Sequence, residues 1–325
     1  MGPSGAIARH PRGVREASII LRRRHALRIL ISGANGFLGR HLCQCFSEQR
    51  HEVRRLERHP LPGDDRGFAW DPAQGRMDDA ALQGVEAVIH LAGAPIAGAR
   101  WDEAYKQRLR DSRVSSTRLL LDRLAAMGTR PKVFVAASAI GIYGDRGDER
   151  LDEASAPGSD FLASLCKDWE AETARAAELG MRLVQLRVGL VLGADGGLLQ
   201  RMSLPFRLGL GARLGSGRQW MSWIAVEDLV AAVGFLMDRP DLSGAFNLTA
   251  PNPVTNAQFT QSLGRALNRP AFLRVPAFAI RAALGEMGEA LLLGGQRVLP
   301  RRLEQSGFQW RSAWVGEALN RIYPR

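Results

Sequence analysis

The chain has 325 residues, of which 46% are hydrophobic and 24% charged, and it is therefore too long and too apolar for a disordered protein. Its three cysteines are an odd number and lack the spacing of zinc ligands. A disulfide framework is therefore excluded and a reducing compartment is favoured, so we expect a cytoplasmic protein. No apolar run reaches about 18 residues, so we expect no membrane-spanning helix.

The net charge of +11 is unevenly distributed. Residues 1–26 carry six arginines and one glutamate, a net +5, and the remaining 299 residues carry only +6. Arginine is scattered elsewhere and no basic stripe alternates with aromatic residues, so we do not expect nucleic-acid binding. We interpret residues 1–26 as a disordered basic extension; a misassigned start codon or an organellar targeting segment is the alternative.

Strands and helices alternate from residue 27 onward. Apolar runs predict buried strands at residues 27–31, 53–56, 87–91, 133–137 and 182–192. Helices are expected at residues 37–49, 103–127 and 160–179. This alternation predicts an α/β fold over residues 27–192, in which a doubly wound parallel sheet has helices on both faces.

The pattern loosens from residue 193, where loops rich in Gly and Pro separate shorter helices. We expect these helices near residues 226–237, 256–267, 276–284 and 313–322. We interpret residues 193–325 as a smaller, partly interwoven substrate lobe.

A glycine-rich turn follows the first strand. Residues 33–39 read Gly-Ala-Asn-Gly-Phe-Leu-Gly and lead directly into a helix. In such a turn Gly33 makes the tight bend, Gly36 lets the backbone approach a pyrophosphate, and Gly39 lets the helix pack on the strand. The layout predicts a dinucleotide site, with a purely structural turn as the alternative. Its expected cofactor-binding residues are Gly33, Asn35, Gly36, Phe37, Leu38 and Gly39.

The end of the second strand decides which dinucleotide is bound. Arg58 can bind a 2′-phosphate, which favours NADP(H) over NAD. Glu57 is the competing signal because it could bind the ribose diol of NAD. A solvated surface charge is the other interpretation of Arg58.

Several strings of the sequence resemble the extended short-chain dehydrogenase/reductases. These are the glycine turn, His-Leu-Ala-Gly at residues 90–93, Ser138 with Tyr143-Gly144, and Trp-Ile-Ala-Val-Glu-Asp-Leu at residues 223–229. The strings at residues 91–96, 205–211, 215–219 and 293–301 resemble, more narrowly, an atypical group known as the epimerase family, which has its own C-terminal segment at about residues 274–322 here. The resemblance implies a Rossmann fold and a bound NADP(H), held additionally by Leu91, Ala92, Gly93, Arg113, Lys167 and Leu190.

The catalytic pattern of those reductases is only partly present. The resemblance assigns Ser138 to the serine that orients a substrate carbonyl and Lys167 to the lysine that holds the nicotinamide ribose. Ala163 stands where the catalytic tyrosine is expected, four residues before Lys167. Tyr143 is a candidate surrogate acid, although packing is the more ordinary role for it.

The substrate is not identified by the motifs. Arg113 replaces the usual Asn of these reductases, and its cation could contact a phosphate or an anionic substrate, or lie on the helix surface. Met221 occupies the position of a diphosphate-binding Arg, so we doubt a nucleotide-sugar substrate; Arg207 and Arg218 are candidate replacements, and Trp223 is a candidate pocket or core residue.

No histidine pair has metal-ligand spacing, so no metal site is expected. The leading hypothesis is therefore an NADP(H)-dependent oxidoreductase with a degenerate Tyr-x-x-x-Lys site that acts on a small-molecule substrate. A non-catalytic NADP(H)-binding or redox-sensing protein, or a sugar-type epimerase, is the alternative. A homodimer through residues 103–127 and 160–179 is expected from the resemblance alone.

Overall fold

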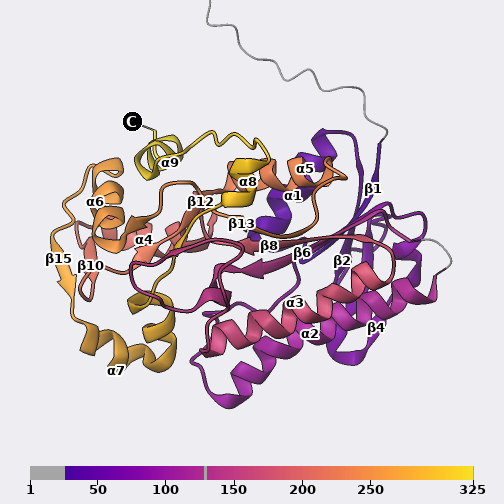
Figure 1. Cartoon of the computed structure of the whole chain (residues 1–325), viewed down its shortest axis with the longest axis horizontal. Coiled ribbons are helices and arrows are strands. Elements are labelled where there is room, and N and C mark those ends of the chain that lie inside the picture. The colour runs from indigo at the N-terminus through magenta and orange to yellow at the C-terminus, as the bar shows by residue number, and fades with distance from the viewer. Residues whose placement is uncertain (1–25, 128–129, 325) are drawn as a thin grey trace, which may run out of the picture.

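A sheet of eight strands forms the centre of the computed structural model, which describes residues 26–127 and 130–324 (Figure 1). The strand order is β13-β8-β6-β5-β1-β2-β3-β4. Every neighbouring pair is parallel except β3 and β4. The strands are β1 (Arg28–Ser32), β2 (Glu52–Glu57), β3 (Gly67–Asp71), β4 (Arg76–Met77), β5 (Ala87–His90), β6 (Val133–Ala139), β8 (Arg182–Val188) and β13 (Gly244–Leu248). The predicted doubly wound parallel sheet is confirmed.

Helices cover both faces of the sheet. Figure 1 shows α1 (Phe37–Glu48) and α5 (Val226–Met237) on one side and α2 (Glu103–Ala126) and α3 (Phe161–Glu178) on the other. Ile29 and Ile31 pack toward α1 and α5, whereas Leu30 packs toward α2, because successive strand residues point to opposite faces. With both faces buried, the central strands are apolar throughout, which is why they are visible in the sequence.

The sheet extends beyond the expected domain boundary at residue 192. Its edge strand β13 pairs with β8 but comes from the segment 193–325 that we interpreted as the substrate lobe. Phe246 and Leu248 of β13 are buried in the same core as α1. Asn247 interrupts the apolar run because its side chain is hydrogen-bonded inside the protein, so the run did not predict a strand. Segments of the sheet and segments of the lobe therefore alternate along the chain.

The remaining elements form the lobe and its connections. The expected strand at 182–192 is divided into β8 and β9, and the helix expected at 276–284 continues to residue 288 with a non-helical backbone at Gly285. The lobe contains β9 (Leu190–Gly193), α4 (Gly197–Arg207), β10 (Ala212–Leu214), β11 (Trp220–Met221), β12 (Trp223–Ala225), β14 (Val254–Thr255), α6 (Asn256–Ala266), β15 (Leu273–Val275), α7 (Ala277–Gly288) and α9 (Val315–Ile322). Shorter connections are η1 (Pro72–Gln74), η2 (Asp79–Leu82), η3 (Ile140–Tyr143), β7 (Arg150–Leu151), the π-helical η4 (Glu289–Leu293), β16 (Arg297–Val298) and α8 (Arg301–Gln305).

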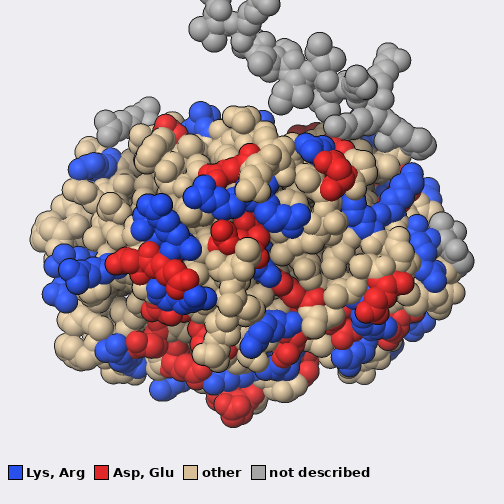
Figure 2. All heavy atoms as spheres, viewed as in Figure 1, with Lys and Arg blue, Asp and Glu red and all other residues tan. Residues whose placement is uncertain are grey.

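Basic and acidic side chains are interspersed on the face of the molecule in Figure 2, which shows no continuous basic band. None of the helices in the described ranges is both long enough and apolar enough to cross a bilayer. The basic extension expected at residues 1–26 lies, except for Ala26, outside the described residues.

Candidate cofactor and active site

The glycine turn has the geometry that a dinucleotide cradle needs. Gly33 has φ +71°, and a Cβ on Gly39 would lie 2.2 Å from the carbonyl oxygen of Gly33, so a side chain cannot be accommodated at either position. The first N–H groups of α1 receive no side-chain cap from Gly36, and Asn35 and Gly36 are exposed. Free N–H groups and a positive helix end at an exposed turn fit a pyrophosphate.

Phe37 has a second contact that the sequence did not reveal. Its ring lies against the turn at residues 193–197, where a Cβ on Gly196 would be 2.3 Å from Phe37 Cδ2. Asp195 of the same turn bonds His41 of α1 at 3.0 Å. The start of the lobe is thereby attached beside the cradle.

Arg58 and Glu57 differ sharply in their surroundings at the end of β2. The Glu57 carboxylate is buried and accepts a 2.9 Å hydrogen bond from Arg55 Nε, while Nη2 of the same guanidinium pairs with Asp64. Arg58 is exposed and has no hydrogen-bond or ion-pair partner within the described part of the chain. A free guanidinium beside a carboxylate that is buried and already hydrogen-bonded fits a ribose 2′-phosphate better than an unmodified diol.

A buried hydrogen-bond relay holds the loop after β5 in place. Thr117 Oγ1 donates to the backbone oxygen of Arg113 (2.6 Å), so it accepts from His90 Nε2 (3.0 Å). His90 Nδ1 then accepts from Ser32 Oγ (2.7 Å), whose oxygen accepts from the N–H groups of residues 91 and 92. Burial lowers the pKa of His90 to about 3, so the ring is neutral. The relay aligns the predicted cofactor residues Leu91 and Ala92 with the glycine turn.

Ser138, Glu170 and Arg187 form a nearly buried cluster at the carboxyl end of the sheet. Ser138 is 4% exposed, and its Oγ donates to Glu170 Oε1 at 2.6 Å. Arg187 binds both oxygens of Glu170, at 2.9 Å through Nε and 2.8 Å through Nη2. Because the Ser138 proton is directed at Glu170, the oxygen of Ser138 faces any ligand as an acceptor. Sequence reasoning gave Glu170 no role, although it lies three residues after Lys167.

Lys167 forms no hydrogen bond or ion pair with this cluster in the described ranges, and its expected contact with the nicotinamide ribose stays a prediction. Cys166 is buried against η3, and Glu170, four residues later, points the same way. Lys167 is turned by about 100° from Cys166 on the helix and is exposed. The inward positions four residues apart are therefore Leu162 and Cys166, and neither can act as a tyrosine or a lysine.

Tyr143 has the packing role, the more ordinary of the two roles expected for it, and the surrogate-acid alternative is corrected. Its side chain is 0% exposed, and its hydroxyl donates to Asn247 Oδ1 (2.7 Å) and accepts from Arg187 Nη1 (2.9 Å). Burial raises the pKa of Tyr143 to about 12. A fully enclosed phenol with both bonds satisfied inside the protein cannot contact a substrate.

Arg113 points into the same region from α2, with its guanidinium over the ring of Trp169 at 5.2 Å. Its carbon Cζ lies 3.2 Å from the position of a Cβ on Gly93, so it covers the loop after β5. Leu190, the other expected cofactor contact, lies in β9, which pairs with β12.

Three predicted substrate residues lie apart from the cluster. Trp223 is 0% exposed and donates from Nε1 to the backbone oxygen of Asn252, so it belongs to the lobe core and the pocket prediction is corrected. Arg207 is exposed and stacks on Tyr323 at 5.9 Å, at the other side of the lobe core from the sheet. Arg218 is exposed beyond β10, and its guanidinium has no hydrogen-bond or ion-pair partner among the described residues.

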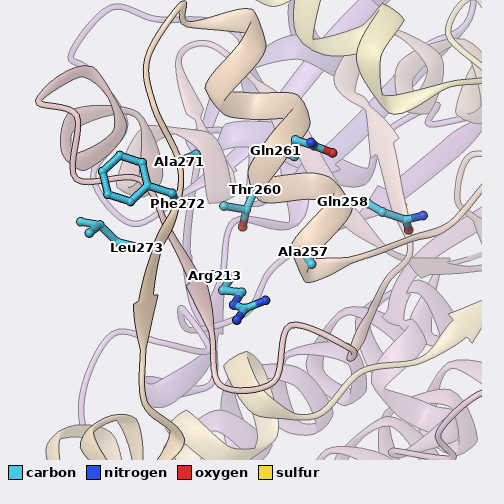
Figure 3. Close-up of a pocket in the computed structure, with 8 residues that line it drawn as sticks. All are labelled: Arg213, Ala257, Gln258, Thr260, Gln261, Ala271, Phe272 and Leu273. Carbon is cyan, nitrogen blue, oxygen red and sulfur yellow. The ribbon is translucent and has the colours of Figure 1, made fainter.

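A separate shallow hollow of about 430 Å³ lies in the lobe between α6 and the two strands β10 and β15 (Figure 3). Arg213 of β10 and Thr260 of α6 line it, and the Thr260 hydroxyl is buried without a hydrogen-bond partner among the described residues. None of the cluster residues lines this hollow. In the described ranges no group of three His, Cys, Asp or Glu residues is arranged to hold a metal.

Known proteins match nearly the whole described chain. A model described as the NAD dependent epimerase/dehydratase family matches residues 29–249, and one described as a domain of unknown function, DUF1731, matches residues 275–322. An epimerase family protein of Mycobacterium bovis is 46% identical over 90% of this chain and 96% of its own length.

Two solved structures are also similar. Human epimerase family protein SDR39U1, crystallised with NADPH, is 35% identical with a TM-score of 0.82, covering 91% of this chain and 99% of that chain. A nucleoside-diphosphate sugar epimerase from Corynebacterium glutamicum is 33% identical with a TM-score of 0.75, covering 92% of this chain and 59% of that chain.

Proposed function

The chain belongs to the NAD dependent epimerase/dehydratase family, and we propose that it is an NADP(H)-dependent oxidoreductase of a small-molecule substrate. The observation that carries the proposal is the hydrogen bond from Ser138 to Glu170, at the same end of the sheet as the glycine cradle. It supplies a proton path where the usual tyrosine is missing.

NADP(H) is proposed over NAD on two grounds. Arg58 has no partner among the described residues at the end of β2, while the competing carboxylate of Glu57 is buried and hydrogen-bonded to Arg55. The human relative described above was crystallised with NADPH, which supports the same choice. The N–H groups of Phe37 and Leu38 would hold the pyrophosphate.

Ser138 and Glu170 would move the proton. In the oxidation of an alcohol, the substrate hydroxyl gives its proton to Ser138 Oγ as the Ser138 proton passes to Glu170 Oε1, and the carbonyl forms as hydride leaves the carbon. NADP+ supplies the hydride acceptor when bound. Reduction runs the same path in reverse and returns the proton from Glu170 through Ser138 to the developing alkoxide. Arg187 keeps both oxygens of Glu170 in place for this transfer.

A binding protein without catalysis is the second candidate, because Leu162 and Cys166 occupy the inward positions of the catalytic helix. In that case NADP(H) would act as a structural or redox-sensing ligand. We further propose a cytoplasmic protein, in keeping with its three free cysteines, and a homodimer through the outer surfaces of α2 and α3.

The cofactor is tested by calorimetric titration of the cofactor-stripped protein with NADPH and NADH. We expect tight NADPH binding, and a loss of about 10- to 100-fold in Arg58→Ala because charge-assisted bonds to the phosphate disappear. Arg265→Ala, which removes an exposed arginine from α6, is the matched control. Equal binding of NADPH and NADH in the wild type would refute the role of Arg58.

Turnover is tested with NADPH and a broad panel of carbonyl compounds. Ser138→Ala and Glu170→Gln should each lower kcat by about 10²- to 10⁴-fold, the usual contribution of a general acid. Binding of NADPH without turnover on any compound, or turnover unaltered in Ser138→Ala, would favour the non-catalytic candidate.

A further inference from the structure

Arg113 carries a positive charge that no acidic side chain balances. It forms no ion pair within the described ranges, and the titratable groups acting on it are the Cys166 thiol and the Tyr105 hydroxyl. Burial lowers the pKa of Arg113 and raises that of Cys166 to about 12, so the neighbouring thiol stays neutral. A guanidinium taken out of water without a counter-ion costs free energy that an anionic partner would recover.

Two donors of this guanidinium remain available. Nη1 donates to the backbone oxygen of Leu109 (3.1 Å) and approaches Ser112 Oγ (3.4 Å), and Nη2 donates to the backbone oxygen of Ala94 (3.1 Å). A guanidinium has five N–H groups. The hydrogen on Nε and the second hydrogen on Nη2 therefore have no acceptor among the described residues. The protein acceptors hold the Arg113 guanidinium in one orientation. Its N–H groups on Nε and Nη2 that have no acceptor can bind a ligand.

Arg113 lies beside the loop after β5, with its Cζ 3.2 Å from the position of a Cβ on Gly93. The glycine cradle opens into α1, on one face of the sheet, whereas Arg113 belongs to α2 on the opposite face (Figure 1). Its guanidinium stacks on Trp169, the residue next to Glu170 in α3. Arg113 and Glu170 both lie close enough to the Cys166 thiol to act on it, so the guanidinium is near the proposed proton path.

The local charge indicates the class of anion. Arg113 contributes one positive charge, and its hydrogen bonds within the described ranges go to neutral oxygens and to no carboxylate. One carboxylate balances this charge, whereas a phosphate monoester, with about −1.5 to −2, exceeds it. The planar fork of a guanidinium also matches a carboxylate.

We propose that the substrate is an organic anion whose carboxylate binds the free N–H groups of Arg113 while its reacting carbonyl or hydroxyl lies at Ser138. This rests on the proposed oxidoreductase function for the reaction but not for the binding step. It assigns Arg113 to substrate selection and removes it from the cofactor contacts expected from the sequence.

The test is a binding measurement on the NADP+-loaded protein with pyruvate and its methyl ester as a matched probe pair. The midpoint of thermal unfolding is followed against probe concentration, with sodium chloride matched. We expect pyruvate to stabilise the wild type at concentrations about 10- to 100-fold lower than the ester, which is the worth of a charge-assisted bond. Arg113→Gln should erase this difference, and Arg108→Gln, an exposed arginine of the same helix, should retain it.

Arg113→Lys is a second variant for the case in which Arg113→Gln fails to fold. It keeps the positive charge and loses the planar guanidinium. We expect it to bind NADPH like the wild type and to need more pyruvate for the same stabilisation. Identical responses to pyruvate and its ester in the wild type would overturn the proposal. So would a weakened NADPH affinity in Arg113→Gln with an unaltered pyruvate response, which would assign the cation to the cofactor.

The failure of this inference is distinguishable from failure of the proposed function. Absence of NADPH binding or of turnover in the wild type refutes the oxidoreductase, whereas the probe pair reports on Arg113 without any turnover. Preference for pyruvate that depends on Arg113 in a catalytically silent protein would still support the anion site.

Discussion

Removal of the Glu170 carboxylate should destabilise the protein strongly. The Glu170 and Arg187 side chains are only 12% and 11% exposed, and Arg187 Nε and Nη2 both donate to this carboxylate. Glu170→Ala leaves the Arg187 guanidinium without a counter-ion and Ser138 without its acceptor. Breaking one side of such a buried pair costs about 3–5 kcal/mol.

Scanning calorimetry gives the measurement. A loss of that size should lower the Tm by about 5–10 °C in a chain of this length. Glu170→Gln, which keeps hydrogen-bonding atoms but not the charge, should fall between Glu170→Ala and the wild type. Glu178→Ala is the matched control on the same helix, because Glu178 is exposed at its last turn, and it should alter stability by less than about 0.5 kcal/mol. A Tm for Glu170→Ala within about 1 °C of the control would refute the view that the pair is effectively buried.

Four further outcomes follow from the same structure. Gly39→Ala should abolish NADPH binding in calorimetry, because its Cβ would lie 2.2 Å from a backbone oxygen that cannot move without opening the cradle; wild-type affinity would contradict the cradle geometry. Lys167→Ala should bind NADPH within about twofold of the wild type, since an exposed side chain turned away from the cluster contributes little; a large loss of affinity would restore the motif-based role. The Cys166 thiol should resist iodoacetamide at pH 8 in the folded protein, as followed by mass spectrometry, because burial raises its pKa to about 12; rapid labelling would show that the helix opens. His90 has a pKa of about 3 in the folded chain, against about 6.5 when unfolded, so the unfolded chain binds the extra proton between these values and stability falls as the pH is lowered through this window. His90→Gln should flatten that slope of Tm against pH, and an unaltered slope would assign the pH dependence to other groups.

Sequence patterns were informative where a strand is apolar on both faces. The runs that became β1, β5 and β6 were predicted to within two residues at their ends, since no other element packs such continuous apolar residues at this length. The strands β3 and β4, at one end of the sheet, were not predicted because they are short and mixed in polarity. β13 was missed for a different reason: its Asn247 is satisfied by Tyr143 and Leu299, partners that lie far away in the sequence.

The active-site helix shows most clearly where sequence reasoning ends. Residues 161–170 lie in the helix expected at residues 160–179. The four-residue spacing from Ala163 to Lys167 is compatible with the Tyr-x-x-x-Lys motif. The rotation of the helix is set by the burial of Cys166 and Trp169 against their neighbours, and that rotation places Lys167 in solvent and Glu170 at Ser138. Neighbouring residues of a helix point about 100° apart. Aligning the motif one residue too early or too late therefore places a different side chain toward Ser138.

The sequence by itself determined the parallel α/β sheet, the glycine-rich turn that opens α1 and the family, because each depends on local residue types at fixed spacing. Only the tertiary structure decided that Tyr143 is enclosed, that Glu170 joins Arg187 to Ser138, and that the charge of Arg113 has no carboxylate beside it. Burial, proton direction and charge balance depend on which distant segments meet, and those contacts are formed only when the whole chain has packed.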